Sequence, residues 1–193
     1  MTGHSSKALE TDFDSMPDEL AEIARAALER VVESGALDVD NWSTQDRSTF
    51  CRLLACSDYA TGVMRRQTAW LCESVAAGRF DAPPAASYEY AGDKEDEAAI
   101  RRSLRQYRHR TLTHIMWRDF SGQATLEESL HSLSALADEM LNAASELAAR
   151  VLDDRLGRPR NDKGEEIPLV ILAMGKLGGG ELNFSSDVDV IFL

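Results

Sequence analysis

The last 25 residues of this 193-residue chain, LVILAMGKLGGGELNFSSDVDVIFL, constrain its fold and its chemistry more than any other segment. A glycine-rich turn is followed there by Asp-Val-Asp, and apolar runs flank both. The run 168–174 is typical of a strand buried on both faces, and residues 187–193 predict a second strand. Because strand side chains alternate between faces, Asp187 and Asp189 should share one face, about 6.5–7 Å apart at the backbone.

The glycine-rich turn has the residue types that a phosphate site needs. Glycine lets the backbone approach a phosphate closely and adopt positive φ angles, and backbone N–H groups in such a turn can bind phosphate oxygens. Two serine hydroxyls and a lysine ammonium group could supply further contacts. The residues that we expect to line this site are Gly175, Lys176, Gly178, Gly179, Ser185 and Ser186.

The two carboxylates favour a magnesium site. Asp187 and Asp189 could converge on one or two Mg²⁺ ions, which prefer oxygen ligands and would bridge nucleotide phosphates. Each feature alone is commonly structural, because paired acids occur on solvated strand faces, glycine clusters occur in plain turns, and Lys176 alone is a typical surface lysine. The combination G-x₁₁-D-x-D between two apolar runs is more specific, and it matches neither a P-loop nor a dinucleotide-binding fingerprint.

The stretch from Ala173 to Asp189 closely resembles the glutamine synthetase adenylyltransferase/adenylyl-removing family, which belongs to the polymerase-β-like nucleotidyltransferases. Proteins of that family carry two such domains, and the Asn-Phe-Ser-Ser-Asp form found here resembles the N-terminal, adenylyl-removing copy. Four upstream segments of this chain also resemble family signatures. They are LLACSD at 53–58, RQYRHR at 105–110, WRD at 117–119 and LSALAD at 133–138. The resemblance covers most of residues 45–193, with departures from the family pattern at Ala173, Thr111 and His114.

The resemblance implies a mainly α-helical bundle that leads into the start of an α/β polymerase-β-like nucleotidyltransferase domain. It also implies that a third metal-site carboxylate and a second catalytic domain lie beyond Leu193. We therefore expect this chain to be an N-terminal fragment of a longer enzyme, with an incomplete nucleotidyltransferase domain and no activity by itself.

The same resemblance implies the reaction and its participants. This half would remove AMP from a modified tyrosine of glutamine synthetase by phosphorolysis and release ADP, and the missing half would attach AMP from ATP. Asp187 and Asp189 would hold Mg²⁺ as the cofactor. Glutamine synthetase would be the partner, and a PII-type signalling protein would regulate the enzyme.

Two other functions stay open on the residues alone. One is a different polymerase-β-like nucleotidyltransferase that acts on RNA or on a small molecule. The other is a non-catalytic helical interaction module whose α/β start is incidental.

The rest of the chain divides by its hydrophobic pattern. Residues 1–14 are polar and aperiodic and predict a disordered tail. Residues 15–156 predict a helical region, whose clearest helix carries an apolar stripe at 3.6-residue spacing over 126–151. The charged connector after Gly157 leads into the truncated domain, which we place at 157–193.

Capping and breaking residues set the expected helix limits. Helix starts are predicted at Ser15 and at Ser43, and the first helix should stop at Gly35. The second helical stretch should break near Ser57-Asp58 and close at Gly78. A loop is expected over 79–94, followed by a helix from Glu95 to Phe120 and a stop at Gly122.

The charge, the apolar segments and the cysteines of the chain limit its expected cellular location and binding partners. The net charge of −12 argues against general nucleic-acid binding, which needs a surplus of lysine and arginine. No apolar leader or membrane-length segment is evident, so a cytoplasmic location without membrane contact is expected. Three cysteines without metal-binding spacing, Cys51, Cys56 and Cys72, predict reduced, buried, structural thiols.

A second set of polar residues has two interpretations. The basic run of Arg101, Arg102, Arg105, Arg108 and Arg110 could contact a phosphate or an acidic partner, or could form a solvated face paired with nearby acids. His114 with Trp117, Arg118 and Asp119 could form a site. The structural interpretation, with Trp117 in a core and Arg118 and Asp119 in structural pairs, is favoured.

Overall fold

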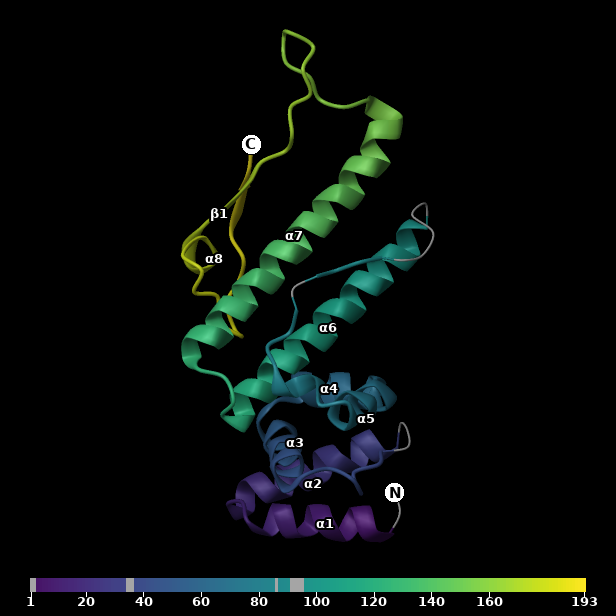
Figure 1. Cartoon of the computed structure of the whole chain (residues 1–193), viewed down its shortest axis with the longest axis vertical. Helices are drawn as coiled ribbons and strands as arrows, with labels where there is room; N and C mark the ends of the chain where they lie inside the picture. Colours follow the sequence, from purple (N-terminus) through teal and green to yellow (C-terminus); the bar gives the residue numbers. More distant parts are fainter. Residues whose placement is uncertain (1–2, 34–36, 86, 91–95) are drawn as a thin grey trace. The chain divides into compact units, whose positions relative to one another are not determined.

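The computed structural model describes residues 3–33, 37–85, 87–90 and 96–193. Its helices are α1 (Gly3–Asp14), α2 (Asp18–Val32), α3 (Thr44–Cys56), α4 (Asp58–Arg66), α5 (Thr68–Ala76), the 3₁₀ turn η1 (Arg79–Asp81), α6 (Glu97–Ser121), α7 (Leu126–Leu156) and α8 (Gly175–Gly178). The strands are β1 (Ile171–Ala173) and β2 (Val190–Phe192). The chain is therefore mainly helical, as the sequence predicts (Figure 1).

The chain forms two compact units. The first consists of residues 1–84 and 113–126, and the second of residues 85–112 and 127–193. Helix α6 contributes its first part to the second unit and its last part to the first. The predicted boundary at residue 157 falls inside the second unit.

The prediction of a disordered tail over residues 1–14 is wrong for the described residues 3–14, which form α1. Leu9 and Phe13 are four residues apart and therefore lie on one face of this helix. Both side chains are completely buried, and α1 contacts α2 and α3. Two apolar residues at helical spacing are enough to bury one face of an otherwise polar segment.

Aromatic side chains form the centre of the first unit. Phe80 stacks on Trp117 with ring centroids 4.7 Å apart, and Trp42 meets Trp117 edge to face at 5.9 Å. Phe50 meets Trp42 in a second edge-to-face contact at 5.4 Å. Such pairs contribute beyond the area that they bury. Trp117 is thus a core residue, as the structural interpretation of this segment predicts.

The helix breaks in the first unit follow the capping signals in part. Ser57 ends α3 and also caps α4, since its N–H donates to the Leu53 carbonyl and its side chain accepts from Ala60 N–H at 3.1 Å. The predicted break at Ser57-Asp58 is therefore confirmed. The predicted cap at Ser15 is wrong, because α2 begins after Pro17 and the Ser15 hydroxyl donates to the Asp12 carbonyl instead.

The predicted stops are confirmed at two glycines. Gly78 and Gly122 have φ angles of 62° and 75°, a backbone conformation that favours glycine. The predicted loop after Gly78 begins with the short turn η1. The predicted stop at Gly35 and the predicted helix start at Glu95 lie outside the described residues.

His114 and Arg118 hold the η1 segment against the end of α6. A ring nitrogen of His114 is 2.9 Å from the Ala82 carbonyl oxygen, and the buried Arg118 donates to the carbonyls of Phe80 and Gln123. Burial lowers the pKa of His114; the hydrogen bond to Ala82 opposes this shift, and the charge of Arg118 adds to it. Arg118 is therefore structural, as predicted, with backbone carbonyls among its partners.

The three cysteines are free thiols, and they differ in exposure. Cys51 is buried, which raises its pKa to about 12. Burial also raises the pKa of Cys72, which is only half-buried. Cys56 is exposed, so the prediction of a buried thiol is wrong for this residue.

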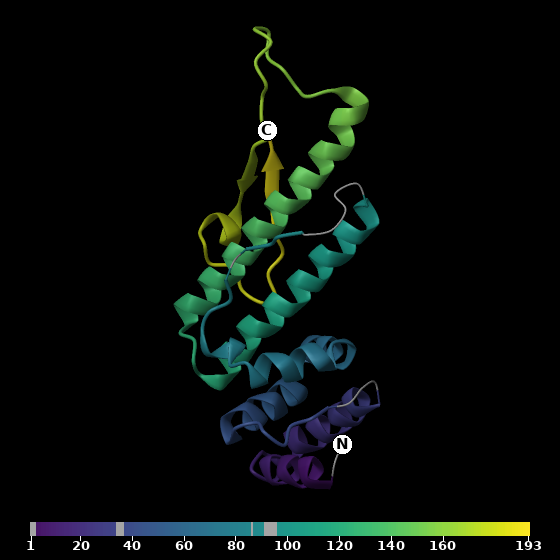
Figure 2. The same ribbon diagram turned by 45° about the vertical axis from the view of Figure 1, so that its right-hand side comes forward.

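Helices α6 and α7 run side by side in the second unit (Figures 1 and 2). Glu139 of α7 accepts a hydrogen bond from the Tyr107 hydroxyl of α6 and another from the backbone N–H of Tyr88. Burial, followed by this hydrogen bond, raises the pKa of Tyr107 to about 12. One carboxylate therefore joins both helices to the segment that precedes α6.

The two strands pair antiparallel, with Leu172 opposite Ile191. The prediction that 168–174 is buried on both faces is wrong, because Leu172 and Met174 are 47% and 43% exposed. Within the described residues the sheet has two strands, so apolar side chains on both strands remain in contact with solvent. Among the described helices, none combines the length and apolar character needed to cross a bilayer.

The structural role of α1 predicts that Phe13→Ala lowers the free energy of unfolding by about 3–5 kcal/mol, the usual cost of removing a fully buried phenylalanine ring. Urea denaturation measures this difference. Glu10→Ala is the control, because this exposed carboxylate is in a surface ion pair with Arg25, whose removal should cost less than about 1 kcal/mol. Equal stability of Phe13→Ala and the wild type would contradict the helical packing of this segment.

The environment of His114 predicts a pH dependence. Its lowered native pKa means that the unfolded chain binds a proton more readily than the native chain as the pH falls through about 6.5. The free energy of unfolding should therefore decrease between pH 7.5 and pH 5.5. In His114→Gln, which keeps a side-chain donor for Ala82, this decrease should be smaller, as measured by urea denaturation at both pH values.

Candidate active site

The strand pairing brings the start of the glycine-rich turn to one of the two acids. Met174 N–H donates to the Asp189 carbonyl at 2.9 Å, which extends the β1–β2 ladder by one residue pair. The chain then turns at Gly175, whose φ angle is +55°. A methyl group placed on Gly175 would lie 3.9 Å from Oδ2 of Asp189. The Asp189 carboxylate and the first glycine of the motif are therefore neighbours.

Gly178 has a steric reason to be glycine. A Cβ atom at this position would lie 2.5 Å from the carbonyl oxygen of Ala173, which is closer than real Cβ atoms approach such an atom. The absence of a side chain allows α8 to fold directly against the end of β1. The glycine at this position therefore shapes the turn.

The turn uses several of its own backbone donors. The N–H groups of Gly178, Gly179 and Gly180 donate to the carbonyls of Met174, Gly175 and Leu177, respectively. The first N–H groups of a helix have no acceptor within it. Those of Gly175 and Lys176, at the start of α8, are therefore the turn's better-placed donors for an external oxygen.

Asn183 organises the two serines of the motif. Its side-chain oxygen accepts hydrogen bonds from the hydroxyls of Ser185, at 3.4 Å, and of Ser186. The Ser186 N–H also donates to the Asn183 carbonyl at 3.2 Å. Both hydroxyls therefore point to an internal acceptor in this structure, and each would have to rotate in order to donate to a phosphate.

Asp187 and Asp189 are both exposed and lie just before β2 rather than within it. The predicted strand over 187–193 is thus shorter, because the ladder bonds begin at Asp189. No ion pair involves either carboxylate in the part of the chain that the structure describes, so their oxygens are available to a cation. Within the same residues, no cluster of three or more His, Cys, Asp or Glu side chains suits a metal.

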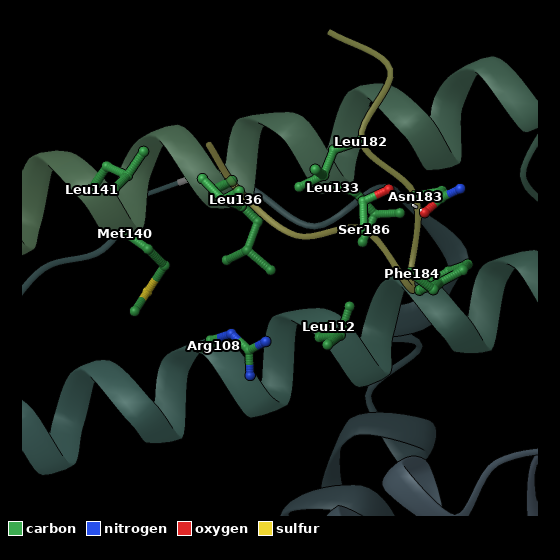
Figure 3. A pocket seen from close by; sticks show the side chains of 12 residues that line it. Arg108, Leu112, Leu133, Leu136, Met140, Leu141, Leu182, Asn183, Phe184 and Ser186 are labelled. Carbon is green, nitrogen blue, oxygen red and sulfur yellow. Dashed lines mark hydrogen bonds between the residues drawn. The ribbon is translucent and has the colours of Figure 1, made fainter. Parts of the chain in front are cut away.

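A cavity of about 220 Å³ lies behind the segment that carries the acids (Figure 3). Arg108 and Leu112 of α6 form one wall and leucines of α7 form another. The third side is closed by Leu182, Asn183, Phe184, Ser186 and Val188. The lining is mostly apolar. The loop between the glycine turn and the acids is therefore incompletely packed on this side.

Three arginines of the basic run of α6 have two different surroundings. Arg101 and Arg102 pair with Glu97 and Asp96, as the solvated-face interpretation predicts. Arg108 instead lines the cavity behind the motif.

Two residues, Ser134 and Asn183, hold the motif loop in a way that the sequence does not predict. Ser134 of α7 accepts a hydrogen bond from the buried N–H of Leu182 at 3.1 Å. Asn183 orients the serines, as described above. Ser134 lies in the LSALAD segment, but nothing in the sequence connects it with a residue 48 positions later.

Comparison with known proteins defines the family. The sequence pattern of the glutamate-ammonia ligase adenylyltransferase family matches residues 48–193, which is most of the chain and includes the whole motif. The chain therefore belongs to this family.

Curated relatives agree with the family match. The chain is 35% identical over 182 residues to the bifunctional glutamine synthetase adenylyltransferase/adenylyl-removing enzyme of Vibrio parahaemolyticus, covering 92% of this chain and 19% of that protein. The enzyme of the same description from Thioalkalivibrio sulfidiphilus is 44% identical over 126 residues, which are 65% of this chain and 13% of that protein. The one from Shewanella woodyi is 49% identical over 98 residues, which are 51% of this chain and 10% of that protein. The chain thus spans about a fifth of the length of the Vibrio parahaemolyticus relative.

The two central glycines of the turn give a matched pair of variants. Gly178→Ala should lower the free energy of unfolding by about 1–3 kcal/mol, because the new methyl group overlaps the Ala173 carbonyl. Gly179→Ala should cost nothing comparable, because its methyl group would meet only Gly175 and Lys176 oxygens at 3.7 Å. Urea denaturation of both variants checks the difference, and equal stabilities would contradict the close approach at Gly178.

Proposed function

We propose that this chain forms part of an enzyme that removes adenylyl groups from glutamine synthetase. One observation carries the proposal: the Asp189 carboxylate lies beside Gly175 at the start of the glycine turn. A cation held by the acids would then be close to a phosphate held by the turn. The Asn-Phe-Ser-Ser-Asp form of the motif supports the adenylyl-removing direction, and the names of the relatives include that activity.

The proposed reaction is a phosphorolysis. An oxygen of inorganic phosphate attacks the phosphorus of the tyrosine-bound adenylyl group, the bond between that phosphorus and the tyrosine oxygen breaks, and ADP forms. The tyrosine oxygen leaves as a phenolate and takes up a proton. No oxidation or reduction occurs. Catalysis of this type depends mainly on positioning and on charge neutralisation.

The residues of the motif fit a magnesium-dependent site. Asp187 and Asp189 are exposed oxygen donors without ion-pair partners among the described residues, and Mg²⁺ is typically held by one or two carboxylates together with substrate phosphates. When bound, Mg²⁺ would neutralise charge on the reacting phosphates. The phosphate-binding surface would consist of Gly175, Lys176, Gly178, Gly179, Ser185 and Ser186.

Within this surface, the start of α8 is the main phosphate contact. The N–H groups of Gly175 and Lys176 have no acceptor within the helix, and the Lys176 side chain adds a positive charge. Gly178 and Gly179 shape the turn, because their N–H groups are already bonded within it. Ser185 and Ser186 would release Asn183 when they donate to a phosphate oxygen.

The wider setting of the enzyme is also proposed. Glutamine synthetase is the partner protein, a PII-type signalling protein is the regulator, and the location is the cytoplasm, without nucleic-acid or membrane contact. The acidic balance of the chain supports the absence of nucleic-acid binding. A nucleotidyltransferase domain that is completed elsewhere in a longer protein would leave the 193-residue chain inactive by itself.

The decisive experiment uses a protein of the relatives' full length that contains this chain. It is mixed with adenylylated glutamine synthetase, phosphate and Mg²⁺, and ADP is measured over time. Asp187→Asn should lower the rate of ADP formation by at least about a hundredfold, because it removes a charge that holds the cation. Asp162→Asn, which makes the same change at an exposed position of the connector, should keep the wild-type rate.

The reverse reaction separates the alternatives. If this motif serves only adenylyl removal, Asp187→Asn should still attach AMP from ATP to unmodified glutamine synthetase. Loss of both reactions would assign the motif to both directions. Equal ADP formation by Asp187→Asn and the wild type would contradict a catalytic role for Asp187, and a wild-type protein that forms no ADP would favour the helical interaction module or another substrate.

A further inference from the structure

We infer that Ser134 of α7 is a positioning residue for the nucleotidyl-transfer motif, and this inference rests on the proposed function. Its hydroxyl accepts a hydrogen bond from the Leu182 N–H at 3.1 Å and donates to the Leu130 carbonyl at 2.9 Å. Ser134 and Leu182 are 5% and 7% exposed. The contact is therefore buried, and both hydrogen-bonding functions of the hydroxyl are used.

The contact lies between the two functional parts of the motif. Leu182 follows the glycine turn, which ends where the Glu181 N–H donates to the Lys176 carbonyl at 2.7 Å. It precedes Asp187 by five residues. The far side of the loop is held at Asp189, by the ladder bond from Met174. Ser134 therefore fixes the first residue of the loop that leads from the glycine turn to the acids.

Packing alone does not hold this loop. Leu182, Asn183 and Ser186 all line the 220 Å³ cavity, so the loop has free volume on one side (Figure 3). A loop beside a cavity can shift without overlapping its neighbours. The hydrogen bond that Leu182 N–H donates to Ser134 of α7 removes this freedom, because the Ser134 hydroxyl is itself oriented by the Leu130 carbonyl.

Loss of the Ser134 hydroxyl should displace the loop and lower the reaction rate. In Ser134→Ala the Leu182 N–H would be buried without an acceptor, which is costly. The loop would then move into the cavity or toward water to satisfy this group. Asp187 and the serines, which lie on the same loop, would leave their positions relative to the glycine turn. Small displacements of reacting groups lower rates strongly.

The first test is hydrogen exchange, measured by mass spectrometry on the full-length protein that contains this chain. Peptides covering 181–186 should exchange about tenfold faster in Ser134→Ala than in the wild type, because the bond that protects the Leu182 N–H is lost. Ser134→Thr keeps a hydroxyl at the same place and should restore slow exchange. Ser132→Ala is the control on the same helix and should exchange like the wild type. Unchanged exchange in Ser134→Ala would overturn the inference.

The second test measures ADP formation by the same variants. Ser134→Ala should lower kcat by about ten- to hundredfold with little change in the KM for adenylylated glutamine synthetase, because the loop affects the reacting groups rather than the docking of the protein substrate. Ser134→Thr should recover most of this loss. Faster exchange at 181–186 with a wild-type kcat would overturn the positioning role. Failure of the proposed function would be seen separately, as a wild-type protein that forms no ADP while its exchange pattern still reports the Ser134 contact.

Discussion

The geometry of the motif depends on how closely the chain can pass its own backbone at Gly178. A side chain there would collide with the Ala173 carbonyl, so the tight turn of α8 exists only because this position has none. The turn reverses the chain direction soon after β1. That reversal lets the later residues return antiparallel and places the Asp189 backbone opposite Met174. Because of this reversal, the Asp189 carboxylate lies next to Gly175.

The second unit supports this turn with polar contacts in addition to the buried side chains of Leu177 and Leu182. Ser134 holds Leu182, Asn183 holds both serines, and Glu139 joins α6, α7 and the segment around Tyr88. Asn183 and Glu139 each accept two hydrogen bonds, and the Ser134 hydroxyl accepts one and donates another. Contacts of this kind fix directions as well as distances, which the proposed binding of a phosphate at this turn would require.

The sequence predicted those features that depend on neighbouring residues. The long helix α7, the break at Ser57 and the stops at Gly78 and Gly122 all follow from local spacing and capping, and the structure has them. The motif from Gly175 to Asp189 was also visible, because its residue types and spacing are unusual together. The family match then confirmed the resemblance that these residues suggested.

What the sequence did not predict depends on distant partners. Helix α1 was missed because two apolar residues among polar ones form a core face only when α2 and α3 are present to receive them. The exposure of the strand around Leu172 depends on which other segments cover the sheet, and the local sequence pattern does not predict this. The contact of Ser134 with Leu182 joins residues 48 positions apart, and a serine inside a helix gives no sign of such a partner.

The double role of Ser57 makes the first unit sensitive to chain length. Only Ser57 separates α3 from α4, and it both ends one helix and caps the other. Each residue advances an α-helix by about 100°. Inserting or deleting one residue just after the Ser57 cap, near the start of α4, would therefore rotate the rest of that helix and turn the buried Val63 and Met64 away from the core. Evolutionary change in length at this junction should be far rarer than at the exposed connector around Asp162.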